Sequence, residues 1–295
     1  LEYVYNNVNS TGEEIDITTN MTSPAVSRYP NGSNWQSLAA YASFKYKPNS
    51  KFVFQSGLRY NHVTAKADFT ENNKFLNLPF DSTTLDAGAL TGTAGVSWIP
   101  SEMIQWKLNA STAFRAPNID DIGKVFDSEP GAVVVPNQNL KPEYAYGGEL
   151  GLKLNFDNVF VLDMATYYTF LDNALIRRNY TLNGESQILY DGELSNIQAI
   201  QNASKEWIYG FEVGMKLNIS EQLQLRSQYN IIGGTEEDDG VEVPVRHIAP
   251  NFGNTHITWE SGRFLIDAFA EYNNELSFNK LAPSEQSKDF IYALD

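Results

Sequence analysis

The stretch IQWKLNASTAFR, residues 104–115, alternates between apolar and polar side chains along its whole length. One side carries Ile104, Trp106, Leu108, Ala110, Thr112 and Phe114, and the other carries Gln105, Lys107, Asn109, Ser111 and Arg115. A helix would spread both sets around its circumference, whereas a strand separates them because successive side chains point in opposite directions. The stretch therefore predicts a β-strand with one apolar and one polar face.

The same two-residue period recurs along the chain and predicts an all-β protein. We expect an antiparallel meander of about 11 strands, most of them about 10 residues long, the length that a tilted strand needs to cross a bilayer. The predicted strands lie at residues 1–6, 36–46, 51–61, 89–98, 104–114, 145–154, 159–170, 207–217, 222–232, 254–260 and 263–272.

Short and long connections alternate between these strands. The short ones are turn-forming stretches such as Pro48-Asn49-Ser50 and Ser261-Gly262, and the long polar ones cover residues 7–35, 62–88, 115–144, 171–206, 233–253 and 273 onward. A regular series of long loops is unusual in a compact domain. It is typical of a transmembrane β-barrel, which has short turns at one rim and long extracellular loops at the other. A soluble β-sandwich or β-solenoid is the alternative, because it also alternates apolar and polar positions.

Composition excludes several classes of function. The 295 residues carry a net charge of -15, which argues against nucleic acid as a partner because phosphate neutralisation needs clustered Lys and Arg. There is no cysteine, so thiol catalysis, disulfides and cysteine zinc sites are excluded. No stretch approaches the ~18 apolar residues of a membrane helix. Motifs of nucleotide-binding loops, serine hydrolases and zinc proteases are also absent from the sequence, which disfavours the hypothesis that the protein is an enzyme.

Two short motifs in order identify a family. The first is the FRAP stretch, formed by Phe114, Arg115, Ala116 and Pro117. The second, NQNLKPE, ends in Asn139, Leu140, Lys141, Pro142 and Glu143, and the strand from Tyr146 follows it. This arrangement resembles TonB-dependent outer-membrane receptors, and the stretch from Asn202 to Glu212 is similar to the family segment that follows.

The resemblance implies an importer in the outer membrane of a Gram-negative bacterium. Family members close about 22 strands around a plug, bind a ligand at the outer face and draw energy from TonB. We therefore expect residues 1–295 to be part of such a barrel, with the plug domain and the terminal strands absent. The implied partners are membrane lipid and lipopolysaccharide, an extracellular small molecule or metal chelate, and TonB through a missing N-terminal segment.

The predicted ligand-binding residues lie where strands enter the long loops. They are Arg115, Asp120, Asp121, Lys124, Arg177 and Arg178. Arginine suits bidentate contacts to carboxylate or phosphate, although a structural ion pair or a solvated loop is the alternative for each arginine. We predict no cofactor and no metal site; the acidic run Glu236-Glu237-Asp238-Asp239 could attract calcium but is expected to be a solvated loop tip.

The motifs also resemble those of haem receptors, in which a histidine between them ligates iron. Residues 118–138 contain no histidine, and His62, His247 and His256 are expected to be surface or strand residues. This favours a siderophore or another chelate over haem. The alternative function is a passive porin or a structural, adhesive barrel, which shares the strand pattern.

Overall fold

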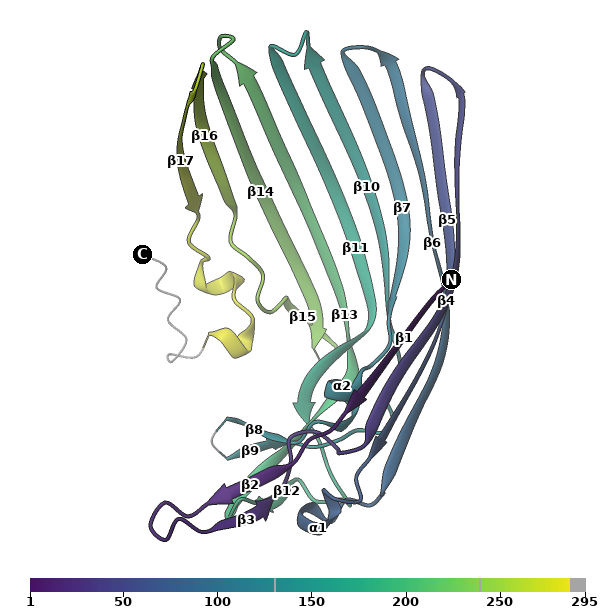
Figure 1. Cartoon of the computed structure of the whole chain (residues 1–295), viewed down its shortest axis with the longest axis vertical. Helices are drawn as coiled ribbons and strands as arrows, with labels where there is room; N and C mark the ends of the chain where they lie inside the picture. The colour runs from purple at the N-terminus through teal and green to yellow at the C-terminus, as the bar shows by residue number, and fades with distance from the viewer. Residues whose placement is uncertain (130, 239, 287–295) are drawn as a thin grey trace.

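A computed structural model describes residues 1–129, 131–238 and 240–286 of the chain. Its main feature is one antiparallel sheet that curves like half of a barrel wall (Figure 1). The strand order along this sheet is β1-β4-β5-β6-β7-β10-β11-β13-β14-β16-β17, which is the order of the sequence. The predicted antiparallel meander of about 11 strands, most of them at least 10 residues long, is therefore confirmed.

The bounds of the sheet strands are β1 Glu2–Val8, β4 Ser33–Asn49, β5 Phe52–Asp68, β6 Ser82–Ser101, β7 Ile104–Arg115, β10 Glu143–Phe156, β11 Phe160–Asn179, β13 Glu193–Asn218, β14 Leu223–Asp238, β16 Phe252–Ser261 and β17 Phe264–Asn273. Several strands extend well beyond their predicted ends into the stretches that we expected to be long loops. β5, β11 and β13 do so because their neighbours continue the hydrogen-bonded ladder past the length of a bilayer. The predicted loops 62–88, 171–206 and 233–253 are therefore partly strand.

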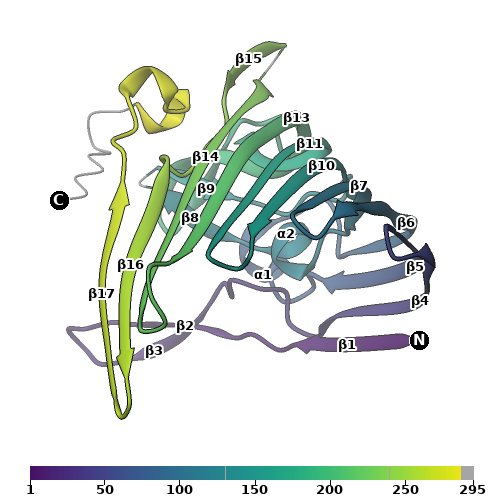
Figure 2. The ribbon, with the colours of Figure 1, turned by 90° about the horizontal axis from the view of Figure 1, so that it is seen from above.

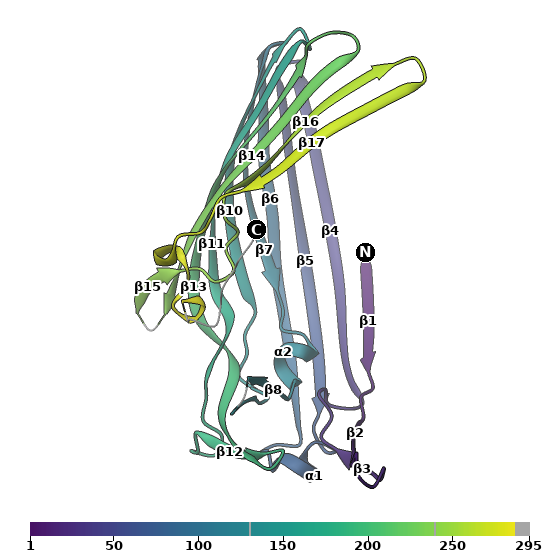
Figure 3. The same cartoon turned by 90° about the vertical axis from the view of Figure 1, so that its left-hand side faces the viewer.

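The tight turns gather at one end of the sheet and the long connections at the other (Figures 1 and 3). Asp157 and Asn158 join β10 to β11 with φ angles of 50° and 57°, a left-handed conformation that Asn and Asp tolerate better than most residues. The alternation of short and long connections is thus built by local turn chemistry at one rim.

The apolar faces of the strands are not covered by a second sheet. On β5, Ala65 and Ala67 pack with α2 (Ile119–Gly123) on the concave side, so the alternate residues face the convex side. Leu58 on that convex side is 62% exposed, and Leu108 on β7 is 57% exposed. Figure 2 shows α1 and α2 inside the curve. The β-sandwich alternative is therefore wrong.

A packed hydrophobic core fills the concave side at the long-loop end. It contains Ala65, Ala67, Phe69, Leu76, Leu78, Ile119, Ile122, Val125, Val133, Val135, Leu140, Leu182, Ile197 and Ala199, all buried. The segment between β7 and β10 supplies six of them, from α2, from β9 (Ala132–Val134) and from the connections around these elements. β8 (Phe126–Glu129) pairs with β9 in the same segment. β9 pairs in parallel with β13, which anchors this segment to the wall. The core closes the loop end of the half-barrel from inside.

Smaller elements decorate the same end. The hairpin β2 (Gly12–Ile15) and β3 (Thr22–Ala25) forms a separate two-stranded sheet, and β12 (Gln187–Tyr190) pairs with the start of β13. β15 (Val241–Pro244) pairs with β14, and α1 (Asn73–Leu76), η1 (Phe278–Lys280) and η2 (Pro283–Glu285) are single turns. No helix within the described ranges is long and apolar enough to cross a membrane.

Candidate ligand cavity at the barrel mouth

The FRAP and NLKPE motifs meet in one ion-pair cluster at the start of the loop end. The guanidinium of Arg115 donates to Asp121 at 2.8 Å and 2.9 Å and to Glu143 at 2.6 Å. Asp121 belongs to the capping box of α2 with Asn118, and Glu143 also accepts a hydrogen bond from the backbone of Leu175 at 2.6 Å. Arg115 therefore ties α2 to β10, and Glu143 ties β10 to β11.

The asparagines of the second and third motifs complete this clamp. Asn202 accepts from the backbone of Lys141 at 2.7 Å and donates to the carbonyl groups of Lys141 and Asn173. Asn137 donates to the carbonyl of Ile200 at 2.8 Å. Of the other motif residues, Leu140 is part of the core, Pro117 is buried and Phe114 lies against Tyr144 with ring centroids 5.6 Å apart. The motifs hold the loop segment of residues 116–142 onto the wall.

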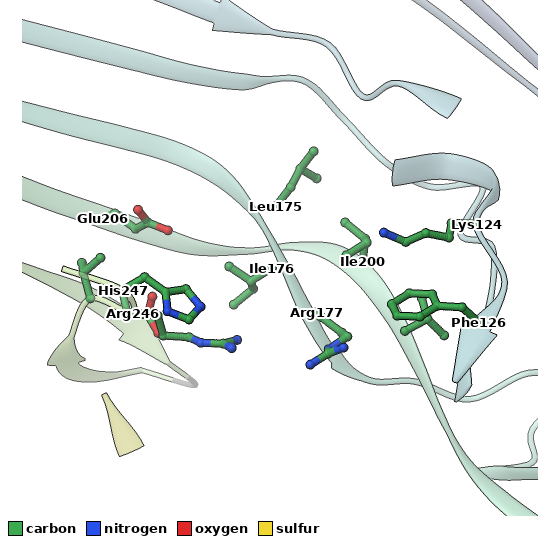
Figure 4. Close-up of a pocket in the computed structure, with 12 residues that line it drawn as sticks. Lys124, Phe126, Leu175, Ile176, Arg177, Ile200, Glu206, Arg246 and His247 are labelled. Carbon is green, nitrogen blue, oxygen red and sulfur yellow. The ribbon is translucent and has the colours of Figure 1, made fainter. Parts of the chain in front are cut away.

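Beside this clamp, on the concave side, lies a cavity of about 350 Å³ that we call the cationic cavity. Its lining residues are Lys124, Phe126, Val134, Leu175, Ile176, Arg177, Ile200, Glu206, Glu236, Val245, Arg246 and His247. They come from the segment after α2, from β8 and β9, from β11, β13 and β14, and from the loop after β15. Figure 4 shows Arg177 between two groups of side chains, with Lys124 and Phe126 on one side and Glu206, Arg246 and His247 on the other.

The four basic residues of the cavity differ in their partners. Lys124 donates to Asp120 at 2.7 Å, and His247 lies 3.0 Å from Glu285. The side chains of Arg177 and Arg246 form no hydrogen bond or ion pair with any part of the chain that the structure describes. The Nε of Arg246 is buried and lacks an acceptor there. Two guanidinium groups thus face the cavity with donors to spare.

Two carboxyl groups complete the wall. Glu206 on β13 stands directly opposite Glu236 on β14, and Glu236 is only 6% exposed. Burial raises the pKa of Glu206, and the nearby charges of Glu236 and Glu143 raise it further. Like charges opposed across two strands are destabilising, so a pair of this kind is unusual in a sheet without a functional reason.

The structure brings some of the predicted ligand residues together and separates others. Lys124 and Arg177 share the cavity, whereas Arg115 and Asp121 belong to the clamp. Asp120 pairs with Lys124 and accepts from the hydroxyl of Tyr29 at 2.9 Å; burial would raise its pKa, but these contacts lower it overall. Arg178 does not line the cavity and reaches the carbonyl of Glu237 at 3.5 Å. Ligand binding by each of these residues stays a prediction.

Sequence reasoning missed Arg246 and Glu206 and treated His247 as a surface residue. Glu206 sits at the predicted end of a long loop, and Arg246-His247 follow a run of valines and proline, so neither position carries a pattern that points to a site. Only the pairing of β13 with β14 and the return of the chain after β15 bring them to Arg177.

The histidines and the acidic run adopt ordinary structural roles. His62 lies within β5, and its ring is 3.5 Å from Asp86, while His256 lies within β16 and pairs with Asp267 at 2.9 Å. Glu236 and Glu237 belong to β14 rather than to a loop tip, and Asp239 lies outside the described residues. Among the residues described, no group of three His, Cys, Asp or Glu side chains could hold a metal ion.

The chain is similar to a known protein family and to several characterised proteins. Residues 1–289 match the family model of the TonB dependent receptor-like β-barrel. A haemoglobin and haemoglobin-haptoglobin-binding protein of Haemophilus ducreyi is 28% identical over 144 residues, which cover 47% of this chain and 14% of that protein. A probable haemoglobin and haemoglobin-haptoglobin-binding protein 1 of Haemophilus influenzae is 26% identical over 209 residues, 61% of this chain and 19% of that protein. The chain thus spans less than a fifth of the length of these two relatives.

Solved structures share the fold at low sequence identity. The copper transporter OprC superposes with a TM-score of 0.71 at 13% identity, covering 91% of this chain and 39% of that protein. The haemophore receptor HasR of Serratia marcescens superposes with a TM-score of 0.65 at 16% identity, and the match covers 91% of this chain and 46% of that protein. The family is one of receptors and transporters, as the motifs predicted. The chain belongs to the TonB-dependent receptor β-barrel family, whose strands lie in the outer membrane of Gram-negative bacteria.

Proposed function

We propose that this chain is the wall segment of an outer-membrane receptor that takes up a nutrient such as an iron chelate with energy from TonB. The observation that carries the proposal is the cationic cavity, which opens on the concave side of a transmembrane sheet at its long-loop end. A ligand arriving from outside would meet this cavity before it reached the lumen. The plug, the remaining strands and the TonB contact would come from the rest of the protein.

Within this proposal, Arg177 contacts the ligand, as the sequence predicted, together with Arg246. Lys124 lines the cavity while paired with Asp120. Arg115 and Asp121 act by holding α2 and β10 in place rather than by touching the ligand, because their charges are already paired. We assign no catalytic step and no resident cofactor to the chain.

The names of the curated relatives favour a haem-bearing ligand. The lack of histidine in residues 118–138 disfavours axial ligation of haem iron in that loop. A chelate held through its peripheral carboxylates by Arg177 and Arg246 would agree with both observations. A passive porin is less well supported, because a packed core occupies the concave side at the loop end.

The test is growth of a deletion strain on single iron sources: haemin, haemoglobin and a panel of siderophores. Complementation with the full-length gene should restore growth on at least one source, and restoration should disappear when TonB is also deleted. Equal growth of the deletion strain on every source would refute receptor function. Restoration without TonB would favour the porin.

A further inference from the structure

We propose that the cationic cavity binds the oxyanion of its ligand, a carboxylate or a phosphate, between the guanidinium groups of Arg177 and Arg246. The inference rests on the proposed function only in placing the cavity on the path of an imported ligand. It goes further by naming the chemical group that is recognised and the residue, Arg246, that recognises it.

The first observation is the buried donor on Arg246. Its Nε is shielded from solvent and finds no acceptor among the described residues. A buried donor without an acceptor destabilises the folded state, more so when the group is charged, so such groups are rare in native proteins. A ligand oxygen at this position would supply the missing acceptor and remove that destabilisation.

The second observation is that Arg246 is held in place by its neighbours. The backbone of Val245 donates to Gly234 at 3.2 Å, and the backbone of His247 donates to the carboxylate of Glu285 at 2.8 Å. The backbone on both sides of Arg246 is therefore held in place, so little backbone freedom remains to be lost on binding. The loop after β15 thus holds the guanidinium group of Arg246 at the cavity.

The third observation is the position of Arg177. It lies in the β11–β13 ladder opposite Ile200, and in Figure 4 its guanidinium and that of Arg246 point toward the same space. The other basic side chains of the cavity, Lys124 and His247, are paired with Asp120 and Glu285. The two arginines are thus left to bind an external anion, and the planar fork of each matches two oxygens of a carboxylate or phosphate.

Glu206 sets a limit on how tightly an anion binds. It lines the same cavity, and its carboxylate repels an oxyanion. Removing the charge of Glu206 should therefore strengthen anion binding, a result that a merely structural arginine pair would not produce. One substitution, at Glu206, is therefore expected to raise the affinity for the anion, whereas substitutions of Arg177 and Arg246 are expected to lower it.

The test is isothermal titration of the full-length receptor in detergent micelles at low ionic strength with citrate and, separately, inorganic phosphate. Binding of citrate alone assigns a carboxylate, and binding of phosphate alone assigns a phosphate. Arg177→Met and Arg246→Met should each weaken binding about tenfold or more, and Glu206→Gln should strengthen it several-fold. Arg59→Met is the matched control, because Arg59 is already paired with Glu2 and Asn61 away from the cavity.

Folding of each variant is checked by its heat-dependent gel mobility, and Arg246→Lys replaces Arg246→Met if the latter does not fold. The lysine keeps the charge but loses the fork, so binding should still weaken. The proposal is overturned if neither anion binds, or if the arginine variants behave like Arg59→Met. Growth on a chelate without anion binding would leave the receptor function standing, whereas anion binding without any uptake would refute the receptor function alone.

Discussion

The ion-pair clamp allows a quantitative prediction for Arg115→Met. The substitution keeps an unbranched apolar side chain but removes the donors to Asp121 and Glu143. The Glu143 side chain is 11% exposed and would retain only the backbone donor of Leu175. Each charge-assisted hydrogen bond contributes about 1.5–3 kcal/mol. Since the Arg115 side chain is 49% exposed, solvent screens the pair, and we expect a loss of about 2 kcal/mol in total.

The loss should appear locally, in the segment that the clamp holds. A change of about 2 kcal/mol corresponds to roughly a thirtyfold rise in the population of locally open states. Hydrogen exchange of the full-length protein in micelles should therefore speed up by that factor over residues 116–142. Exchange in the membrane-spanning part of β7 should stay unchanged.

The control for this prediction is Lys74→Met, which breaks the exposed pair of Lys74 with Glu71. Exposed pairs contribute about 0–1 kcal/mol, so this variant should exchange almost as the unaltered protein does. If Arg115→Met exchanges like Lys74→Met over residues 116–142, the clamp does not stabilise the loop segment and the reasoning fails.

Three further predictions follow from the same contacts. Asn202→Ala removes the side chain that bonds both backbone groups of Lys141 and should destabilise the same segment by about 1–3 kcal/mol, measured by exchange. Burial raises the pKa of Glu206, so the free energy of unfolding falls as pH rises above 4.5, the ordinary pKa of a glutamate. Glu206→Gln should therefore raise the melting temperature at neutral pH and leave it unchanged well below pH 4.5. An equal gain at both pH values would contradict this. β1 and β17 each pair on one side only among the described strands, so the isolated chain should self-associate, and a monodisperse monomer in light scattering would contradict it.

The architecture of the wall could be predicted from the sequence, because each strand carries its own evidence. Alternation in the stretch of residues 104–115 separates an apolar face from a polar one without reference to any partner, and turn residues mark one rim. The length of the predicted strands indicated that they are long enough to cross a bilayer. The FRAP and NLKPE motifs indicated the family because their order and spacing are visible in one dimension.

The far ends of the strands could not be predicted in the same way. Residues 62–68 of β5 and 193–206 of β13 are polar or mixed, and they form strand because neighbouring strands extend alongside them. The core at the loop end was also missed, since its members are scattered over five separate segments whose local patterns do not distinguish a packed loop from a solvated one.

The sequence by itself determined the fold class, the membrane-crossing sheet and the family, because these depend on period, length and short motifs. Only the tertiary structure decided the candidate site. Arg115 was a ligand candidate until its carboxylate partners were seen, and Arg246 had no signal at all. The physical reason is that a cavity depends on which donors remain unpaired after the chain has folded, and pairing between β11, β13, β14 and the loop after β15 is a property of three-dimensional contact.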